Sequence, residues 1–246
     1  MTSPQSVDRA LTLMNAVIDA PQPLSAKALA RLADCSLSTT YHLLGPLIAH
    51  GYLARGPQGY SPGPRTPALH RSFRRHLGAD DHAIGMLLTL VARITGAEAY
   101  FTAYHDGQIT VVDTSERLTA EDSPWTVGPE TKAHATAHGK MLLASLSRAA
   151  RRRYLTGHGM DRLTDRTITD EERFEAEAAG IRRRGVAVSI GEVDPAHTCI
   201  AVPLPHRADR ALSVALPLRD FRTRSGQISS LLVHAAASFP FPAAPE

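Results

Sequence analysis

Glu192, His197 and Cys199 bring a carboxylate, an imidazole and a thiol into one short segment of the sequence. A thiolate nucleophile needs a base and an orienting group, so these residue types could serve a thiol enzyme. Two positions apart on a strand, His197 and Cys199 would point the same way without necessarily touching. No separate oxyanion element is evident. We therefore keep a thiol enzyme that uses Cys199 as an alternative, and we predict that the protein is not an enzyme.

The 12 histidines of the chain raise a second alternative, a metal-responsive DNA-binding sensor. His134 and His138 have the i, i+4 spacing of two ligands on one helical face, but the carboxylate base of a helical zinc motif does not lie beside them. Cys35 and Cys199 show no paired-ligand spacing, and their wide separation argues against a disulfide framework. We predict that the protein uses neither a metal nor a cofactor.

A third group of polar side chains lies in the stretch 24–60, which has the pattern of a short helix, a tight turn, a longer helix and two short strands. Ser25 and Ser36 are good N-cap residues for the two helices. Gly51 suits the end of the second helix, and the Gly and Pro residues of 55–59 suit a turn between strands. This stretch predicts a winged helix-turn-helix.

In a winged helix-turn-helix the second helix enters the major groove, where hydroxyl and imidazole groups can donate to or accept from base edges. Helical spacing turns Leu44 inward and leaves polar residues outward. The predicted DNA contacts are Ser38, Thr39, Tyr41, His42 and, on the wing, Arg55. Pro46 lies inside the same helix and removes one backbone hydrogen bond, so we expect a kink or an early end there.

The 246-residue chain is long enough for two modest domains and a connector, and its formal net charge is +3. Residues 1–76 hold eight lysines and arginines against three acidic residues, an excess that suits contacts with phosphate groups. The sequence shows neither a signal peptide nor an apolar run long enough to span a bilayer. We expect a cytoplasmic protein without a membrane partner.

Two further patterns divide the chain. Residues 7–20 form an amphipathic helical pattern with Leu13, Val17 and Ile18 on one face. The segment 61–64, Ser-Pro-Gly-Pro, cannot continue a strand ladder, so we place a domain boundary there. The predicted parts are a DNA-binding domain at 1–63, a linker helix at 64–78 and a sheet domain at 79–246.

Helical and strand patterns alternate in the last of these parts. Strand patterns at 97–104 and 108–114 flank an Asp-Gly dipeptide, which is a strong hairpin signal. Three more strand patterns, at 186–190, 198–203 and 211–217, precede a terminal helix. Strands joined by hairpins and separated by helices predict an α+β fold, with helices on one or both faces of a sheet.

Three separated motifs have a shared order and spacing: LSTTYHLL at 37–44 with HGYL at 50–53, HATAHGKMLLA at 134–144, and GE at 191–192 with CIAVP at 199–203. Together they resemble the IclR family of bacterial transcriptional regulators over about residues 7–239. The resemblance implies a winged helix-turn-helix, a linker helix and a C-terminal GAF-like effector domain. It also implies a ligand-responsive repressor or activator that binds operator DNA as a homodimer or homotetramer. Two-fold symmetry then predicts paired half-sites.

The resemblance also places an effector pocket in the sheet domain. Carried over by position, its residues are Ala137, His138, Glu192, Cys199 and Ser213, to which we add Tyr100 and Trp125 as aromatic candidates. Free N–H groups at the start of the helix near 134–139 suit a carboxylate, so we expect a small organic acid.

This chain departs from the family pattern at two positions. His42 replaces the usual basic residue of the reading helix, so a bidentate arginine contact with guanine is not available there. His138 replaces the usual small residue, where it either adds a hydrogen-bonding group to the pocket or lies at the surface as a cap.

Overall fold

The computed structural model describes residues 4–76, 81–115 and 128–238. The chain divides into two compact units, Met1–Phe73 and Arg74–Glu246, and the boundary lies within helix α4 (Thr66–His76). None of the helices in these ranges has both the length and the apolar character needed to cross a membrane.

The N-terminal unit is a winged helix-turn-helix. It comprises α1 (Gln5–Asp19), α2 (Ala26–Leu32), α3 (Leu37–Ala49) and an antiparallel wing of β1 (Leu53–Gly56) and β2 (Gly59–Pro62). The predicted caps are confirmed, because the Ser25 and Ser36 hydroxyl oxygens accept hydrogen bonds from the backbone N–H groups at the starts of α2 and α3. Local signals therefore set the limits of both helices.

A single small core holds this unit together. It is formed by the buried residues Leu13, Val17, Ala26, Leu29, Ala33, Leu44, Leu53 and Tyr60. The prediction that Ile18 faces this core is wrong, since Ile18 is 50% exposed. Leu13 and Val17 already define the buried face of α1, and each residue advances about 100° around a helix, which turns Ile18 away from that face.

Helix α3 continues past Pro46 to Ala49, so of the two outcomes expected at this proline, a kink or an early end, the early end is wrong. A proline normally disfavours helical backbone in the residue before it, because its ring clashes with the Cβ of that residue. Here the preceding residue is Gly45, which has no Cβ and has open space around it. The exposed position of Pro46 also lets water reach the backbone that loses its hydrogen bond.

The second unit is built on an antiparallel sheet with strand order β5-β4-β3-β8-β7-β6. Its strands are β3 (Glu98–His105), β4 (Gln108–Thr114), β5 (Gly128–Pro129), β6 (Ala187–Ile190), β7 (His197–Leu204) and β8 (Arg207–Pro217). The predicted β3–β4 hairpin is confirmed, with φ of 48° at Asp106 and 81° at Gly107. Positive φ at both central residues is the signature of the tight turn that Asp-Gly favours.

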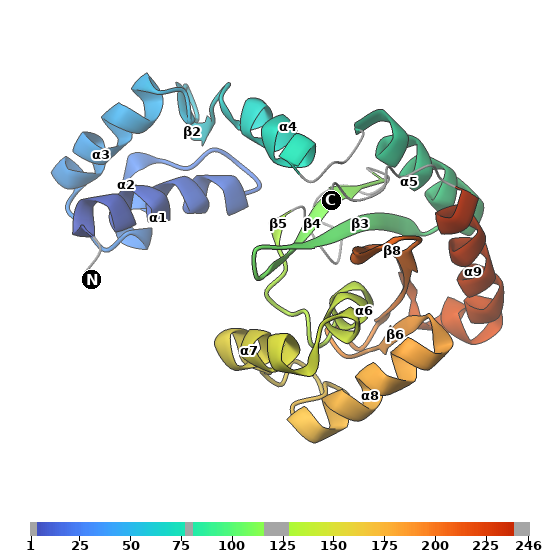
Figure 1. The fold of residues 1–246 in the computed structure, drawn as a ribbon. Helices are drawn as coiled ribbons and strands as arrows, with labels where there is room; N and C mark the ends of the chain where they lie inside the picture. Colours follow the sequence, from blue (N-terminus) through green and yellow to red (C-terminus); the bar gives the residue numbers. More distant parts are fainter. Residues whose placement is uncertain (1–3, 77–80, 116–127, 239–246) are drawn as a thin grey trace. The chain divides into compact units, whose positions relative to one another are not determined.

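Helices cover both faces of this sheet (Figure 1). Helices α5 (Asp81–Thr95) and α9 (Leu218–Ser238) pack together on one face. Helix α6 (Ala137–Ser145) lies on the other face, with α8 (Glu171–Arg184) packed against it. Residues of α7 (Arg148–His158) join the same core as α6. The α+β architecture predicted from the strand and helix patterns is confirmed.

Candidate functional site

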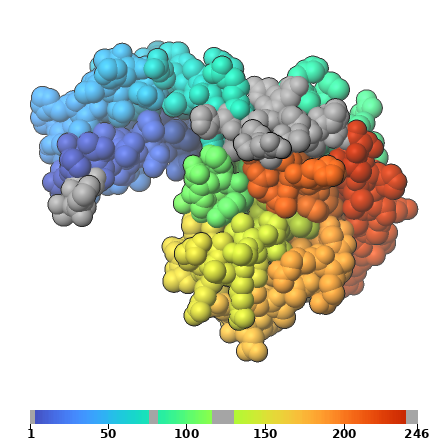
Figure 2. Space-filling model, viewed as in Figure 1, coloured from blue at the N-terminus to red at the C-terminus, as the bar shows by residue number. Residues whose placement is uncertain are grey.

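Helix α3 lies at the surface of the N-terminal unit, in the light blue part of Figure 2. One of its faces exposes polar side chains to solvent. Ser38, Tyr41 and His42 are exposed, and their spacing of three or four residues places them on one side of the helix. Thr39 is only half-buried, and its hydroxyl lies 2.9 Å from the capping hydroxyl of Ser36. Arg55 is exposed on the wing. The helix therefore offers a hydroxyl, a phenol and an imidazole to a partner.

In the second unit, strand register brings several predicted residues onto the sheet face that α6 covers. Tyr100 on β3 lies opposite Ser213 on β8, and Ser213 lies opposite Ala201 on β7. Cys199 is two residues from Ala201 and so shares its face. Like Ala137, which begins α6, Tyr100 and Cys199 belong to the apolar core on this side.

His138 projects from α6 toward these residues on the sheet face. Its Nδ1 atom lies 3.4 Å from Ser213 Oγ and 4.0 Å from Cys199 Sγ, and its ring centroid lies 6.4 Å from that of Tyr100. The side chain of His138 is 0% exposed. The reading of His138 as a solvent-facing cap is therefore wrong. We call Tyr100, His138, Cys199 and Ser213 the His138 cluster.

A buried carboxylate, that of Glu130, stabilises the protonated form of His138. Glu130 Oε2 lies 2.6 Å from His138 Nε2, and Glu130 Oε1 accepts from the Lys132 N–H at 2.7 Å. Burial alone would lower the pKa of His138, but hydrogen bonds to Cys199 and Glu130 and the Glu130 charge raise it to about 9. Burial alone would raise the pKa of Glu130, whereas His138 and the Lys132 N–H lower it. At neutral pH the pair is an imidazolium and a carboxylate.

A second buried carboxylate lies at the edge of the same cluster. The Tyr100 hydroxyl donates to Glu98 Oε2 at 2.7 Å, and Glu98 is buried. Neither Glu98 nor Glu130 was among the predicted site residues. No local pattern marks them, because strand pairing alone brings Glu130, which follows the short β5, beside α6.

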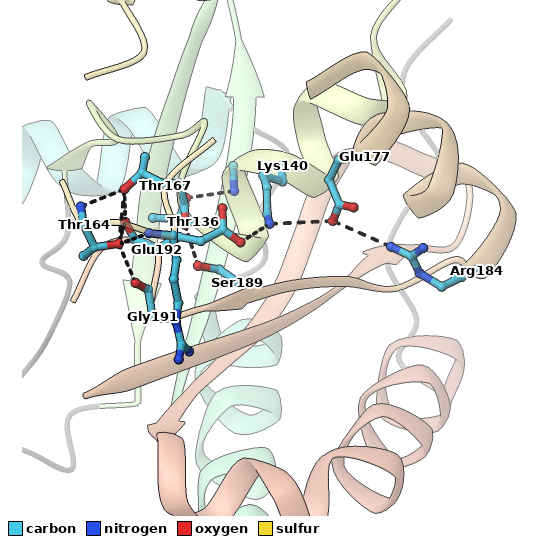
Figure 3. A network of polar contacts seen from close by, with 12 residues as sticks. Thr136, Lys140, Thr164, Thr167, Glu177, Arg184, Ser189, Gly191 and Glu192 are labelled. Carbon is cyan, nitrogen blue, oxygen red and sulfur yellow. Dashed lines mark hydrogen bonds and ion pairs between the residues drawn. The ribbon is translucent and has the colours of Figure 1, made fainter. Parts of the chain in front are cut away.

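Glu192 belongs to a different polar network (Figure 3). Lys140 Nζ on α6 donates to Glu192 Oε1 at 2.5 Å and lies 3.6 Å from Glu177 on α8. The hydroxyls of Thr164 and Thr167 donate to the backbone carbonyls of Gly191 and Glu192. Burial raises the pKa of Glu192, and the Lys140 ammonium offsets that only in part. The network holds the segment after β6 against α6. The sequence did carry one signal for this network: Lys140 lies within the apolar run of the 134–144 motif, and a buried lysine needs an acidic partner.

The start of α6 is closely packed. Thr136 caps the helix by accepting from the Gly139 N–H at 3.2 Å. The backbone of Ala133 lies against Gly139 so tightly that a side chain there would overlap it. One of the N–H groups predicted to receive a carboxylate is thus already bonded within the protein.

The structure does not assemble the thiol site considered from the sequence. His197 Nδ1 pairs with Asp194 at 2.8 Å, whereas Cys199 contacts His138. His134 Nε2 lies 3.0 Å from the Asp161 carbonyl, so His134 and His138 face different partners. Within residues 4–76, 81–115 and 128–238, no three His, Cys, Asp or Glu residues are grouped as a metal site would require. Trp125 lies outside the described residues.

Comparison with known proteins agrees with this organisation. Residues 81–239 match the family model for the C-terminal domain of the bacterial transcriptional regulator IclR, and residues 6–57 match the IclR helix-turn-helix domain. The HTH-type transcriptional regulator BhcR of Paracoccus denitrificans (strain Pd 1222) is 28% identical, over 98% of this chain and 88% of its own length.

Solved structures share the fold. An IclR homologue from Microbacterium hydrocarbonoxydans, complexed with 4-hydroxybenzoate, is 20% identical with a TM-score of 0.75, over 94% of this chain and 95% of the other. An IclR transcriptional regulator from Alicyclobacillus acidocaldarius is 23% identical with the same TM-score of 0.75, over 97% and 98% of the two chains. Together with the two domain matches, this places the chain in the IclR family of bacterial transcriptional regulators.

Proposed function

We propose that this regulator acts in the cytoplasm, without catalytic activity, as a repressor or activator that binds an operator through α3 and responds to a small organic acid bound in its second unit. The observation that carries the proposal is the exposed polar face of α3 in a winged helix-turn-helix. We propose that residues 1–63 read DNA, 64–78 form the linker and 79–246 form the effector and oligomerisation domain.

A symmetric homodimer or homotetramer would present pairs of α3 helices to paired half-sites. Helix α1 supports an oligomer, because three large apolar residues face solvent on it: Val7 is 50%, Leu11 48% and Ile18 50% exposed. Contacts between copies would remove this surface from water. Sedimentation of the operator complex measures the number of chains bound.

Replacing His42 by alanine should weaken binding to the operator about tenfold while changing binding to unrelated DNA little, because a base-edge contact acts only on the correct sequence. Replacing the exposed Arg75 by alanine should weaken both kinds of binding alike and make the salt dependence shallower, as loss of one phosphate contact does. Fluorescence anisotropy with the intergenic DNA beside the gene, at several salt concentrations, measures both effects. Equal losses for the two variants on both DNAs would refute the assigned contacts.

The His138 cluster supports an acidic effector. A protonated imidazole donates from both ring nitrogens, and Nδ1 of His138 faces Ser213 and Cys199. A ligand carboxylate placed there would accept from His138 and from the Ser213 hydroxyl. The IclR homologue from M. hydrocarbonoxydans, bound to 4-hydroxybenzoate, provides a precedent for an aromatic acid.

In a thermal-shift assay of the full chain, at least one acid from a panel of aromatic and short aliphatic carboxylates should raise the melting temperature, since a ligand that binds only the folded state stabilises it. The variant His138→Gln should bind that acid at least tenfold more weakly, because a charge-assisted hydrogen bond is lost. Glu192→Gln, whose carboxylate faces Lys140, shows whether the second network also contacts the ligand. Undiminished binding by His138→Gln would remove His138 from the site.

A further inference from the structure

Thr102 on β3 is fully buried, and its hydroxyl has no hydrogen-bond partner among the residues that the structure describes. Buried hydroxyl groups in folded proteins nearly always have one, because an unsatisfied polar group destabilises the folded state. A valine would fill the same space without that cost. Thr102 therefore has a hydroxyl whose hydrogen-bonding capacity no described residue satisfies.

Strand register places this hydroxyl beside the His138 cluster. Thr102 lies opposite Val111 on β4 and opposite Ala211 on β8, and both neighbours belong to the core on the α6 side. Tyr100 precedes Thr102 by two residues on β3, so the two side chains share a sheet face. A ligand that reaches the His138 cluster on this face would therefore also lie beside Thr102.

We propose that Thr102 is a specificity residue that binds a hydroxyl group on the effector, at the end away from its carboxylate. This inference rests on the proposed effector function. Ser213 lies opposite Tyr100, so Ser213 and Thr102 are diagonal neighbours on adjacent strands, and such positions are about 7–8 Å apart. A carboxylate at Ser213 and a hydroxyl at Thr102 would then be separated by roughly the length of a six-membered ring with para substituents. The effector class is a hydroxylated small organic acid.

The charges of the site favour a hydroxyl over a second acidic group. Glu130 is a buried carboxylate in this region with a lowered pKa, and the cation of the cluster, His138, already faces it. A second ligand carboxylate would meet negative charge without a matching cation. A hydroxyl is neutral, and like threonine it both donates and accepts, so the pair satisfies both groups.

Thr198 on β7 provides a matched control. It is also buried, and within the described part of the chain its hydroxyl also has no hydrogen-bond partner. It directly precedes Cys199, so it points to the opposite sheet face, where α9 packs against β7. Thr102→Val and Thr198→Val make the same chemical change in similar surroundings, and only the first changes the proposed site.

The test uses the full chain and matched pairs of acids: benzoate with 3- and 4-hydroxybenzoate, and butanoate with 4-hydroxybutanoate. Without ligand, each valine variant should melt about 2–4 °C above the wild type, because an unsatisfied hydroxyl is removed. In calorimetric titrations the wild type and Thr198→Val should bind a hydroxylated acid about tenfold more tightly than its parent acid. Thr102→Val should lose that preference and bind the parent acid as the wild type does.

Three results would overturn the inference. If Thr102→Val keeps the preference for the hydroxylated acid, another group binds the ligand hydroxyl. The proposed function then stands, but Thr102 has no part in it. If Thr102→Val melts below the wild type, its hydroxyl is structural. If the wild type binds none of these acids, the proposed effector class fails and the assignment of Thr102 fails with it.

Discussion

Gly139→Ala is expected to destabilise the second unit by about 4 kcal/mol and to lower its melting temperature by about 10 °C. A Cβ at Gly139 would overlap the backbone carbonyl oxygen and Cα of Ala133 and would lie 2.6 Å from the Thr136 hydroxyl that caps α6. Backbone atoms cannot rotate away as a flexible side chain can, so α6 must move from the sheet. Urea unfolding of the full chain, followed by circular dichroism, measures the loss.

Gly157→Ala is the matched control. Gly157 also lies inside a helix, α7, but a Cβ there would have no atom within 4 Å. Alanine reduces the conformational freedom of the unfolded chain, so this variant should be as stable as the wild type or up to about 1 kcal/mol more stable. Similar losses in both variants would show that the Ala133 contact does not matter.

Glu130→Gln is expected to destabilise the protein by about 3 kcal/mol near neutral pH, since it leaves the buried His138 without its counter-charge. The loss should depend on pH. The folded-state pKa of His138 is raised from 6.5 to about 9, so its ion pair stabilises the protein fully below pH 6.5 and loses that effect as the pH rises through about 9. Melting curves of wild type and variant at pH 6.5 and pH 9.5 measure the difference.

At acidic pH the stability that Glu130 contributes changes in the opposite direction, decreasing as the pH falls. The folded-state pKa of Glu130 is lowered, so its contribution is present above the ordinary value of 4.5 and is lost as the pH falls below it. Glu171→Gln serves as the control, because Glu171 pairs with Arg152 at 3.4 Å on an exposed surface, where such pairs contribute little. A loss for Glu130→Gln that is the same at pH 6.5 and pH 9.5 would contradict the charged pair.

The winged helix-turn-helix of the N-terminal unit was almost fully predictable from its residues. Ser25 and Ser36 cap their helices through bonds that span three residues, and Asp106-Gly107 forms its turn in the same local way in the second unit. Such signals act between near neighbours, so a sequence displays them directly. The early end considered at Pro46 was wrong because the effect of the proline depends on Gly45, whose missing Cβ lets the helix continue.

The candidate effector site was predictable only in part. The 134–144 motif identified His138 as a candidate site residue. Its raised pKa could not be predicted, because the sequence does not indicate that Glu130 is its partner. Lys140 and Glu192 are 52 residues apart, and their contact separates Glu192 from the His138 cluster. No periodicity predicts such pairs, because each depends on which face α6 turns to the sheet.

The sequence by itself determined the helix-turn-helix, the polar face of its second helix, the order of strands and helices, and the family. These follow from capping, turn chemistry, hydrophobic periodicity and motif spacing, all of which lie within short segments. Only the tertiary structure decided that His138 is a buried cation, that Glu192 pairs with Lys140, and that Thr102 holds an unused hydroxyl beside Tyr100. The reason is physical: burial, charge and hydrogen-bond satisfaction depend on the atoms that surround a group after distant segments have packed together.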